Sequence, residues 1–409
     1  MNLVPRPQYE ERLTQLMELE EIKVITGVRR CGKSSLLNLA AERLRKTGVP
    51  DSNIYQHGFD EYGTPLHPTA EWLLEIVAPR LEEASKAHPF YLLLDEIQEV
   101  SHWQEAIRRL QTLPQTQILL TGSNAHVLSG DLATLIAGRY VELSMMPLSF
   151  EEYLAFRQSA GEKATTDELF NDYLLFGGMP GLARLPHTSI DERRALLSAI
   201  FDTVVLNDVA THGHIRDLEL LNRLIAFTFS TSGNLVSANN ICNVLKSTGR
   251  KVSPETVDSY LRALEQAYVV TPCPQTGVGG KEVLRPLRKL YPCDTGLRNL
   301  PNGFDPTKDR GFMLENVVLN ELLRHGWTPR VGALPNAEVD FVATRGDERL
   351  YVQVSWSVAD EITLQRELEP LRRLTDAYPR LLLTTDRLGT GTTSEGIVIT
   401  NICDWLLGQ

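Results

Sequence analysis

Long apolar runs, cysteine and positive charge are all scarce in this chain of 409 residues. No uninterrupted apolar run approaches the roughly 18 residues that a transmembrane helix needs, and the first residues lack the apolar core of a signal peptide. The five cysteines are scattered, without CxxC or zinc-binding spacing, which favours reduced thiols over a disulfide framework. We therefore expect a cytoplasmic protein that makes no contact with a membrane.

The charge balance is acidic, with a formal net charge of −11. A surface of this sign is unsuited to coating nucleic acid non-specifically. The stretch between Arg216 and Pro292 departs from the average, because it holds ten basic and six acidic residues. The remaining composition, 42% hydrophobic and 23% charged, is typical of a globular protein, and the length suggests two or three domains.

What the sequence does contain is a phosphate-binding motif near its start. Residues Gly27–Ser34 (GVRRCGKS) fit the pattern GxxxxGK[ST]. Ile22–Thr26 before the motif is rich in β-branched residues and predicts a buried strand, whereas Ser35–Arg45 after it predicts an amphipathic helix. A strand, a glycine-bearing loop and a helix in this order form a cradle for phosphate groups.

Each part of the cradle has a predicted role. The N–H groups of the loop and the positive end of the helix face the phosphates. Lys33 is expected to reach the β- and γ-phosphate oxygens, and the Ser34 hydroxyl to ligate Mg²⁺. The predicted cofactors are thus ATP and Mg²⁺, and the predicted binding residues are Gly27, Arg30, Cys31, Gly32, Lys33, Ser34 and Ser35.

A second pattern, Phe90–Glu96 (FYLLLDE), ends a continuous apolar run with two acids. Such a run predicts a central parallel strand that carries its carboxylates to the edge of the sheet where ligands bind. Asp95 suits contact with the Mg²⁺ shell, and Glu96 suits the position that polarises the attacking water. Acids also begin ordinary loops, so this prediction depends on the phosphate loop upstream.

Two further stretches supply candidates for the same site. Ile118–Asn124 (ILLTGSN) predicts a strand ending in small polar residues, of which Asn124 or Ser123 could sense the γ-phosphate. A simple Gly-Ser-Asn turn is the alternative. Arg139 precedes a predicted strand, Val141–Leu143, and could stabilise transition-state charge in a neighbouring subunit of a homo-oligomer. Pairing with a local carboxylate would explain this arginine equally well.

The chain resembles, over nearly all of its length, the prokaryotic AAA-type ATPases (AAA_14) that carry a C-terminal DUF4143 domain. The resemblance rests on the motifs ITGVRRCGKSSLL, YLLLDEIQEV, LLTGSNA, PLSFEEYL and FGGMPG. It implies an AAA+-like core with strand order near 5-1-4-3-2 and a helical lid that closes over the nucleotide. It also implies roles that match those given above for Lys33, Ser34, Asp95, Glu96 and Asn124.

The expected fold is α/β in four parts. Residues 1–146 predict a P-loop ATPase core with a parallel sheet of the additional-strand type, and residues 147–214 a helical lid. Residues 215–292 have the order of predicted helices and hairpin that is typical of a winged helix-turn-helix, with Thr256–Gln266 in the position of a recognition helix. Residues 293–409 predict helix, hairpin, helix and strand, an order that resembles the core of restriction-endonuclease-like folds.

The winged helix makes DNA a candidate partner through residues 246–289. Basic residues gather around its helix ends and around a predicted hairpin, Val269–Val283, with its tip at Gly277–Gly280, as phosphate contacts would require. They are Lys246, Arg250, Lys251, Lys281, Arg285, Arg288 and Lys289. A winged helix used for domain packing or for contact with a protein is the alternative.

The C-terminal part retains some features of a metal-dependent nuclease. In restriction-endonuclease-like folds, a helix Glu, a strand Asp and an acid-x-Lys on the next strand bind metal and activate water. Glu315 and Asp340 match the first two, and Gln353 stands where the second acid belongs. Gln353 still offers a carbonyl ligand, but its missing charge weakens metal binding. Ser355 stands in place of the lysine that would stabilise developing charge. We expect a degenerate fold that does not cleave, because the alternation of a half-buried strand already accounts for Asp340.

These patterns predict an AAA+-like protein that binds and hydrolyses ATP. Its catalytic residues would be Glu96, Lys33, Asn124 and Arg139, and hydrolysis would move the lid and winged helix relative to the C-terminal module. Two alternatives stay open. One is an ATP-gated, metal-dependent nuclease, and the other is a nucleotide-dependent switch that binds an unknown protein partner with little turnover.

Overall fold

The computed structural model describes residues 4–125, 138–185, 189–211, 213–277, 287–305 and 307–408. Its contacts divide the chain into two compact units. Unit 1 comprises Met1–Met145 and Gln266–Tyr268, and unit 2 comprises Met146–Glu265 and Val269–Gln409. Across the described ranges, every helix is too short or too polar to span a bilayer.

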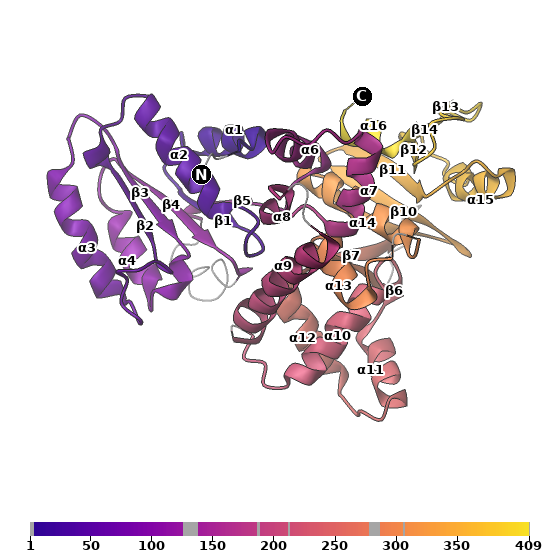
Figure 1. Ribbon diagram of the computed structural model, residues 1–409, viewed down its shortest axis with the longest axis horizontal. Coiled ribbons are helices and arrows are strands. Elements are labelled where there is room, and N and C mark those ends of the chain that lie inside the picture. Colours follow the sequence, from indigo (N-terminus) through magenta and orange to yellow (C-terminus); the bar gives the residue numbers. More distant parts are fainter. Residues whose placement is uncertain are drawn as a thin grey trace. The chain divides into compact units, whose positions relative to one another are not determined.

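Unit 1 is built on a five-stranded parallel sheet (Figure 1). The strand order is β2-β3-β4-β1-β5, which confirms the predicted order 5-1-4-3-2. Its elements are α1 (Pro7–Leu16), β1 (Ile22–Thr26), α2 (Lys33–Lys46), η1 (Asp51–Asn53), β2 (Ile54–Gly58), α3 (Ala70–Glu83), β3 (Phe90–Asp95), η2 (Ile97–Glu99), α4 (Trp103–Leu110), β4 (Thr116–Gly122) and β5 (Tyr140–Ser144).

The central strands of this sheet are apolar because helices exclude water from them. Every residue of β1 is buried, as are the last four residues of β3. Leu73 of α3 and Ile107 of α4 pack into one buried cluster with Leu92 and Leu94 of β3. Parallel strands buried in this way direct their carboxyl ends to one edge, where β1 opens into the phosphate loop.

Unit 2 begins with helices whose starts are encoded locally. Ser149, Thr165 and Ser189 each form a capping box with the Glu three residues later, before α6, α7 and α9 respectively. The helices of unit 2 are α6 (Phe150–Ser159), α7 (Thr166–Phe176), α8 (Pro180–Ala183), α9 (Ile190–Thr203), η4 (Val204–Thr211, a π-helix), α10 (Leu218–Ser230), α11 (Ala238–Ser247), α12 (Pro254–Gln266), α13 (Thr295–Asn302), α14 (Arg310–Arg324), α15 (Glu361–Arg372) and α16 (Ile402–Leu406).

A single nine-stranded mixed sheet runs through unit 2, in the order β13-β14-β12-β11-β10-β9-β7-β8-β6. Its strands are β6 (Leu235–Val236), β7 (Val270–Gly277), β8 (Arg288–Pro292), β9 (Thr328–Leu334), β10 (Ala337–Arg345), β11 (Glu348–Ser355), β12 (Arg380–Thr384), β13 (Gly391–Thr392) and β14 (Ile397–Asn401). The strands after α10 and α12 therefore share one sheet with the C-terminal strands.

The hairpin expected at Val269–Val283 is longer than the sequence indicated. β7 pairs antiparallel with β8, so the second arm lies at Arg288–Pro292. The predicted tip at residues 278–280, together with Lys281 and Arg285, lies outside the described residues. β7 also pairs in parallel with β9, a strand that was not predicted. The prediction missed this arrangement because pairing between β7 and β9 joins segments more than fifty residues apart.

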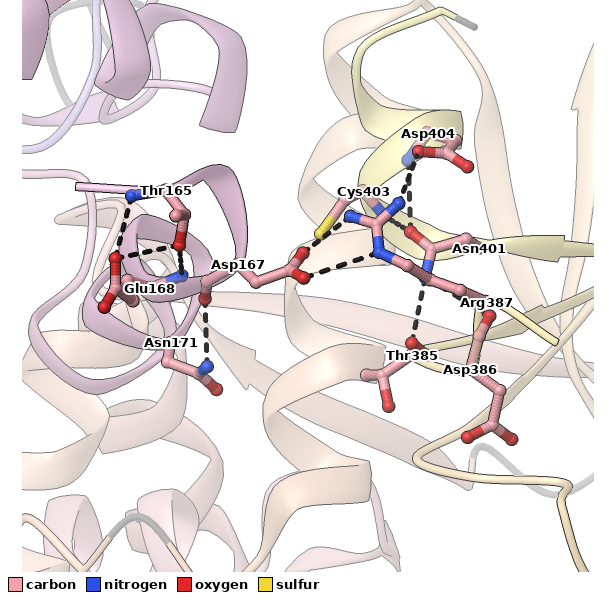
Figure 2. Close-up of polar contacts among 10 residues, drawn as sticks. All are labelled: Thr165, Asp167, Glu168, Asn171, Thr385, Asp386, Arg387, Asn401, Cys403 and Asp404. Atoms are coloured by element: carbon pink, nitrogen blue, oxygen red, sulfur yellow. Dashed lines mark hydrogen bonds and ion pairs between the residues drawn. The ribbon is translucent and has the colours of Figure 1, made fainter. Parts of the chain in front are cut away.

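Helix α7 also contacts the C-terminal part of the chain within unit 2. Figure 2 shows Arg387, in the loop after β12, pairing with Asp167 in the first turn of α7 at 2.7 Å. Arg387 also pairs with Asp404 of α16 at 3.6 Å. The four-part division proposed from the sequence stays a prediction, but residues 147–265 and 269–409 belong to one compact unit.

Candidate functional site

The phosphate loop bends sharply at its glycines. Gly27 has a φ of 142° and Gly32 a φ of 112°, values that side chains rarely tolerate. A Cβ at Gly27 would lie 2.0 Å from the carbonyl oxygen of Met145, so only glycine fits there. Gly32 caps the start of α2, which directs the positive end of the helix at the loop.

Other residues of the predicted cradle line this bend. Arg30 is exposed and has a positive φ of 66°, Ser34 is exposed, and Ser35 is half-buried. Cys31 is buried, its thiol donates to the Met145 carbonyl at 3.4 Å, and burial raises its pKa. Arg6, from the segment before α1, donates to the carbonyl of Cys31 at 3.0 Å and so contacts the loop.

Lys33 turns inward onto the loop that precedes it. Its side chain is 2% exposed, and its Nζ donates to the carbonyl oxygens of Gly27 at 3.0 Å and Val28 at 3.3 Å. The carboxylate of Glu96 lies 3.8 Å away. The buried ammonium group of Lys33 thus lies beside the phosphate loop, and its hydrogen bonds go to neutral carbonyl oxygens.

Asp95 ends β3 and Glu96 follows it, so the two acids lie at the same edge of the sheet, as predicted. Burial raises the pKa of Asp95, while hydrogen bonds with Ser34 and Thr121 act in the opposite direction. Glu96 has a left-handed backbone with φ 54°, which is uncommon outside glycine. The turn directs its carboxylate to Lys33 instead of continuing the strand.

Two residues that the sequence did not single out hold these acids in place. The Thr121 hydroxyl, on β4, donates to Asp95 and accepts from the backbone N–H of Glu96 at 2.9 Å. Gln98 donates to the Glu96 carboxylate and, at 3.4 Å, to the Ser123 hydroxyl. The only sequence signal for Thr121 was its place beside the acids in a predicted neighbouring strand.

Asn124 and Arg139 lie at opposite ends of the sheet. Asn124 follows β4, is 2% exposed, and lies at the carboxyl edge with the phosphate loop. Arg139 precedes β5, and its carbonyl accepts from the N–H of Ile22 at the start of β1. Arg139 therefore cannot reach the phosphate loop of its own chain, and the role expected in a neighbouring subunit stays a prediction.

Comparison with known proteins agrees with this geometry. An uncharacterized protein of Haemophilus influenzae is 34% identical over 405 residues, which cover 99% of each chain. An uncharacterized protein of Methanocaldococcus jannaschii is 30% identical over 85% of this chain and 77% of its own. The chain belongs to the family of these two proteins. Residues 19–154 match the family model described as an AAA domain, and with the sheet and loop this gives an AAA-type P-loop ATPase fold, which is a nucleotide-binding fold.

Residues 167–308 of this AAA-domain protein match a second model, described as a domain of unknown function, DUF8612. The expected DUF4143 domain is therefore not confirmed. Among solved structures, the Walker-type ATPase PABY2304 of Pyrococcus abyssi is similar with 16% identity and a TM-score of 0.47, over 73% of this chain and 96% of that one.

Several basic residues expected to contact DNA are occupied within the AAA-domain protein itself. Arg250 pairs with Asp217 and, at 3.3 Å, with Glu219. Arg288 pairs with Glu265 of α12 at 2.8 Å. Lys289 is 1% exposed, so the phosphate contact expected of it is wrong. The sequence identifies these basic residues, but it does not show that acidic residues distant in the chain lie close enough to pair with them.

The nuclease-like acids converge on that buried lysine. Lys289 of β8 lies 3.2 Å from Glu315, 2.8 Å from Glu338 and 3.6 Å from Asp340. Burial alone would lower the pKa of Lys289, but the three carboxylates outweigh burial and raise it. Burial raises the pKa of both Glu315 and Asp340. The acids thus have a lysine beside them, but it is Lys289 of β8 and not a residue at position 355 of β11.

The remaining residues of this cluster are also occupied. Gln353 accepts from the N–H of Asp340 at 3.3 Å and donates to Glu367 at 3.0 Å. Ser355 donates to the carbonyl of Ser357 at 3.2 Å. Among the residues that the structure describes, no three His, Cys, Asp or Glu side chains gather in a way that could hold a metal ion.

Proposed function

We propose that this protein binds ATP with Mg²⁺ on Gly27–Ser34 and hydrolyses it. The observation that supports this best is the convergence of Lys33, Asp95 and Glu96 at the carboxyl edge of one parallel sheet, with Lys33 and Glu96 3.8 Å apart. In P-loop enzymes, catalysis consists mainly of positioning and electrostatic stabilisation of phosphate oxygens. The residues present supply both.

The site fits this cofactor pair. Positive φ at Gly27 and Gly32 shapes the bend that backbone N–H groups need to surround a phosphate. Ser34 and Asp95 fit Mg²⁺, which commonly takes one or two protein ligands and completes its shell with water and phosphate oxygens. Bound Mg²⁺·ATP would supply the phosphoryl group that is transferred to water.

Each side chain then has a defined task in the proposal. Lys33 exchanges its two carbonyl acceptors for phosphate oxygens, which are stronger partners because they are charged. Glu96 orients a water molecule and accepts its proton, and Gln98 fixes the direction of the Glu96 carboxylate. Asn124 donates to the γ-phosphate from the end of β4.

Two substitutions test the proposal. Lys33→Ala should weaken ATP binding on the order of 100-fold, because a charge-assisted contact is lost. Glu96→Gln should retain binding but lower kcat by about 100-fold or more, as expected when a general base is removed. ATP binding is measured by titration calorimetry, and ATP hydrolysis by a colorimetric assay of released phosphate.

Glu99→Gln is the matched control, because Glu99 is an exposed carboxylate in the short helix that follows Glu96. Wild-type phosphate release in Glu96→Gln would remove the role assigned to Glu96. Tight ATP binding by the wild-type protein with no measurable turnover would instead favour the nucleotide-dependent switch.

We also propose that hydrolysis moves unit 2 as a whole. The expected lid, winged helix and C-terminal module lie in one compact unit, and the last two share a continuous sheet. Motion between the winged helix and the C-terminal module would break the pairing of β7 with β9. A hinge between the two units requires no such break.

The acid cluster around Lys289 favours a structural role over a nuclease. A metal ion would have to displace a lysine that three carboxylates hold, and the site lacks a second acid at Gln353. Of the basic residues expected to contact DNA, those that are exposed remain candidates. Lys246 and Lys251 are two of them, and they lie near the carboxyl end of α11. The exposed face of α12 also carries Glu255, whose negative charge opposes contact with DNA phosphates.

If DNA binds at these lysines, Lys246→Glu with Lys251→Glu should reduce the slope of log affinity against log salt by about 2, because two phosphate contacts are lost. Fluorescence anisotropy with a labelled duplex at several salt concentrations measures this slope. The control is Lys163→Glu with Lys308→Glu, which reverses the same amount of charge at exposed positions elsewhere in unit 2. An equal decrease of the salt slope in both double variants would show that only net charge matters and that Lys246 and Lys251 do not contact DNA.

A further inference from the structure

The chain leaves the ATPase sheet through a short segment, Met145–Leu148, that is fixed at both ends. Its first residue belongs to unit 1 and the others belong to unit 2. In unit 1, the N–H of Met145 donates to the carbonyl of Thr26 at 2.7 Å, directly before the phosphate loop. The Met145 carbonyl fills the space beside Gly27 and accepts from the Cys31 thiol at 3.4 Å. A shift of the phosphate loop must therefore displace Met145.

The other end is held by side chains and backbone of unit 2. The Pro147 carbonyl accepts from Arg324 of α14 at 3.1 Å. Leu148 donates its N–H to the carbonyl of Gly178 at 2.8 Å, and its own carbonyl accepts from the Tyr173 hydroxyl at 2.8 Å. Two residues after the contact with the phosphate loop, the chain is thus anchored to α7, α14 and the turn after α7.

The turn that holds Leu148 is itself closely packed. The N–H of Gly178 donates to the buried carboxylate of Asp294 at 2.7 Å. A Cβ at Gly178 would lie 2.5 Å from the Leu148 carbonyl, and one at Gly177 would lie 2.0 Å from Asp294. This close packing explains the glycine pair in the FGGMPG motif, which the ATPase site does not use. A displacement of Leu148 would be passed on to the start of α13 through Asp294.

The second connection between the units reaches the same place in unit 1. Gln266–Tyr268, between α12 and β7, belongs to unit 1. The Tyr268 hydroxyl lies 3.5 Å from the Glu142 carboxylate, and that carboxylate accepts from the Thr26 hydroxyl at 2.5 Å. Met145 and Gln266–Tyr268, the parts of unit 1 at which the chain passes to unit 2, therefore both contact residues at or next to the first glycine of the phosphate loop.

From these contacts we propose that Met145–Leu148 is a coupling segment, which transmits the nucleotide state of the phosphate loop to unit 2. This inference rests on the proposed nucleotide binding. The loop and Met145 are in contact without free space, so rearrangement of Lys33 and the loop around phosphate moves Met145. Because Leu148 is hydrogen-bonded in both directions, the movement reaches Gly178 and Asp294 and not only the chain between the units.

Hydrogen–deuterium exchange of the full chain, with and without the ATP analogue AMPPNP and Mg²⁺, tests this. In the wild type, the analogue should slow exchange in residues 27–35 and change exchange at the Leu148 and Gly178 amides by about five-fold or more, the lower range of allosteric coupling. Gly178→Ala should keep the effect at residues 27–35 and lose it beyond Met145. Gly181→Ala is the matched control, since a Cβ there meets nothing within 4 Å.

Tyr173→Phe provides a milder second variant in case Gly178→Ala does not fold. It removes only the hydroxyl that donates to Leu148, and the distal response should fall to less than half of the wild-type change. Tyr153→Phe is its control, because that hydroxyl donates to Asp172 instead. Protection of residues 27–35 in the wild type with no change at Leu148 and Gly178 would overturn the coupling segment. No protection of residues 27–35 would instead overturn the proposed nucleotide binding.

Discussion

Lys33 of unit 1 and Lys289 of unit 2 are both lysines whose side chains are 2% exposed, yet their surroundings differ in one decisive respect. Lys33 is held by two carbonyl oxygens, with one carboxylate at 3.8 Å. Lys289 lies within 3.6 Å of three carboxylates. The first ammonium keeps a positive charge that the protein does not fully neutralise, and the second is neutralised completely.

This difference distinguishes a ligand site from a structural one. A buried cation with neutral partners gains much from an incoming anion, because the anion replaces weak acceptors with charged ones. A buried cation enclosed by carboxylates gains nothing from another anion, and removing it leaves several buried charges uncompensated. Sequence motifs identify neither case alone, since both sites combine lysine with nearby Asp and Glu.

The largest expected effect comes from exchanging both lysines for an apolar residue of similar length. Lys289→Met should lower the free energy of unfolding by about 3–5 kcal/mol, because Glu315 and Asp340 lose their buried counterion. Lys33→Met should change it by about 1 kcal/mol or less, since only carbonyl acceptors and one more distant carboxylate are affected. Urea unfolding followed by circular dichroism measures both.

A partial rescue would sharpen this result. Adding Asp340→Asn to Lys289→Met removes one uncompensated charge and should restore part of the lost stability. A loss for Lys33→Met as large as that for Lys289→Met would contradict the distinction drawn between the two sites.

Asp294 extends the comparison to a buried carboxylate that backbone amides hold. Its oxygens accept from Gly178 at 2.7 Å and Leu297 at 3.1 Å, and burial raises its pKa from 3.8 to about 6. A raised folded-state pKa means that the folded protein binds more protons than the unfolded chain between these values, so stability falls as pH rises through this window. The fall amounts to about 3 kcal/mol at about 1.4 kcal/mol per pKa unit.

The difference in unfolding free energy between wild type and Asp294→Asn isolates this contribution. As pH rises from about 4 to about 6, the unfolding free energy of the variant should increase by about 3 kcal/mol relative to that of the wild type. Above about pH 6 the difference should stay constant. The loss of one amide contact adds a constant penalty that does not depend on pH. A difference that is flat across the whole window would show that Asp294 does not titrate there.

The sequence predicted unit 1 closely because its information is local. The strand, loop and helix around Gly27–Ser34 are consecutive, and the apolar run before Asp95 fixes a buried parallel strand. A parallel sheet then brings the ends of such strands to one edge without further information. Thr121 and Gln98 were not predicted, since polar residues near the ends of strands have many uses, and only their hydrogen-bond partners identify this one.

Unit 2 was harder to predict, because its contacts join distant segments. The pattern placed Lys289 among basic residues of a winged helix, but its side chain reaches Glu315 of α14 and Asp340 of β10. The absence of lysine at Ser355 suggested a site without a cation, whereas the cation comes from residue 289. Pairing of β7 with β9 had no local signal either.

The smallest expected effect completes the comparison with a cation that is exposed. Arg387 pairs with Asp167 at 2.7 Å and Asp404 at 3.6 Å (Figure 2). Its side chain is nevertheless 52% exposed. Water and salt screen such pairs, and ordering the long side chain opposes their formation. Arg387→Ala should therefore leave the urea midpoint unchanged within error, although its partners are acids like those of Lys289. The measurement is repeated at low and high salt. A midpoint that falls as far as in Lys289→Met would mean that the kind of partner, and not burial, decides what a lysine or arginine contributes in this protein.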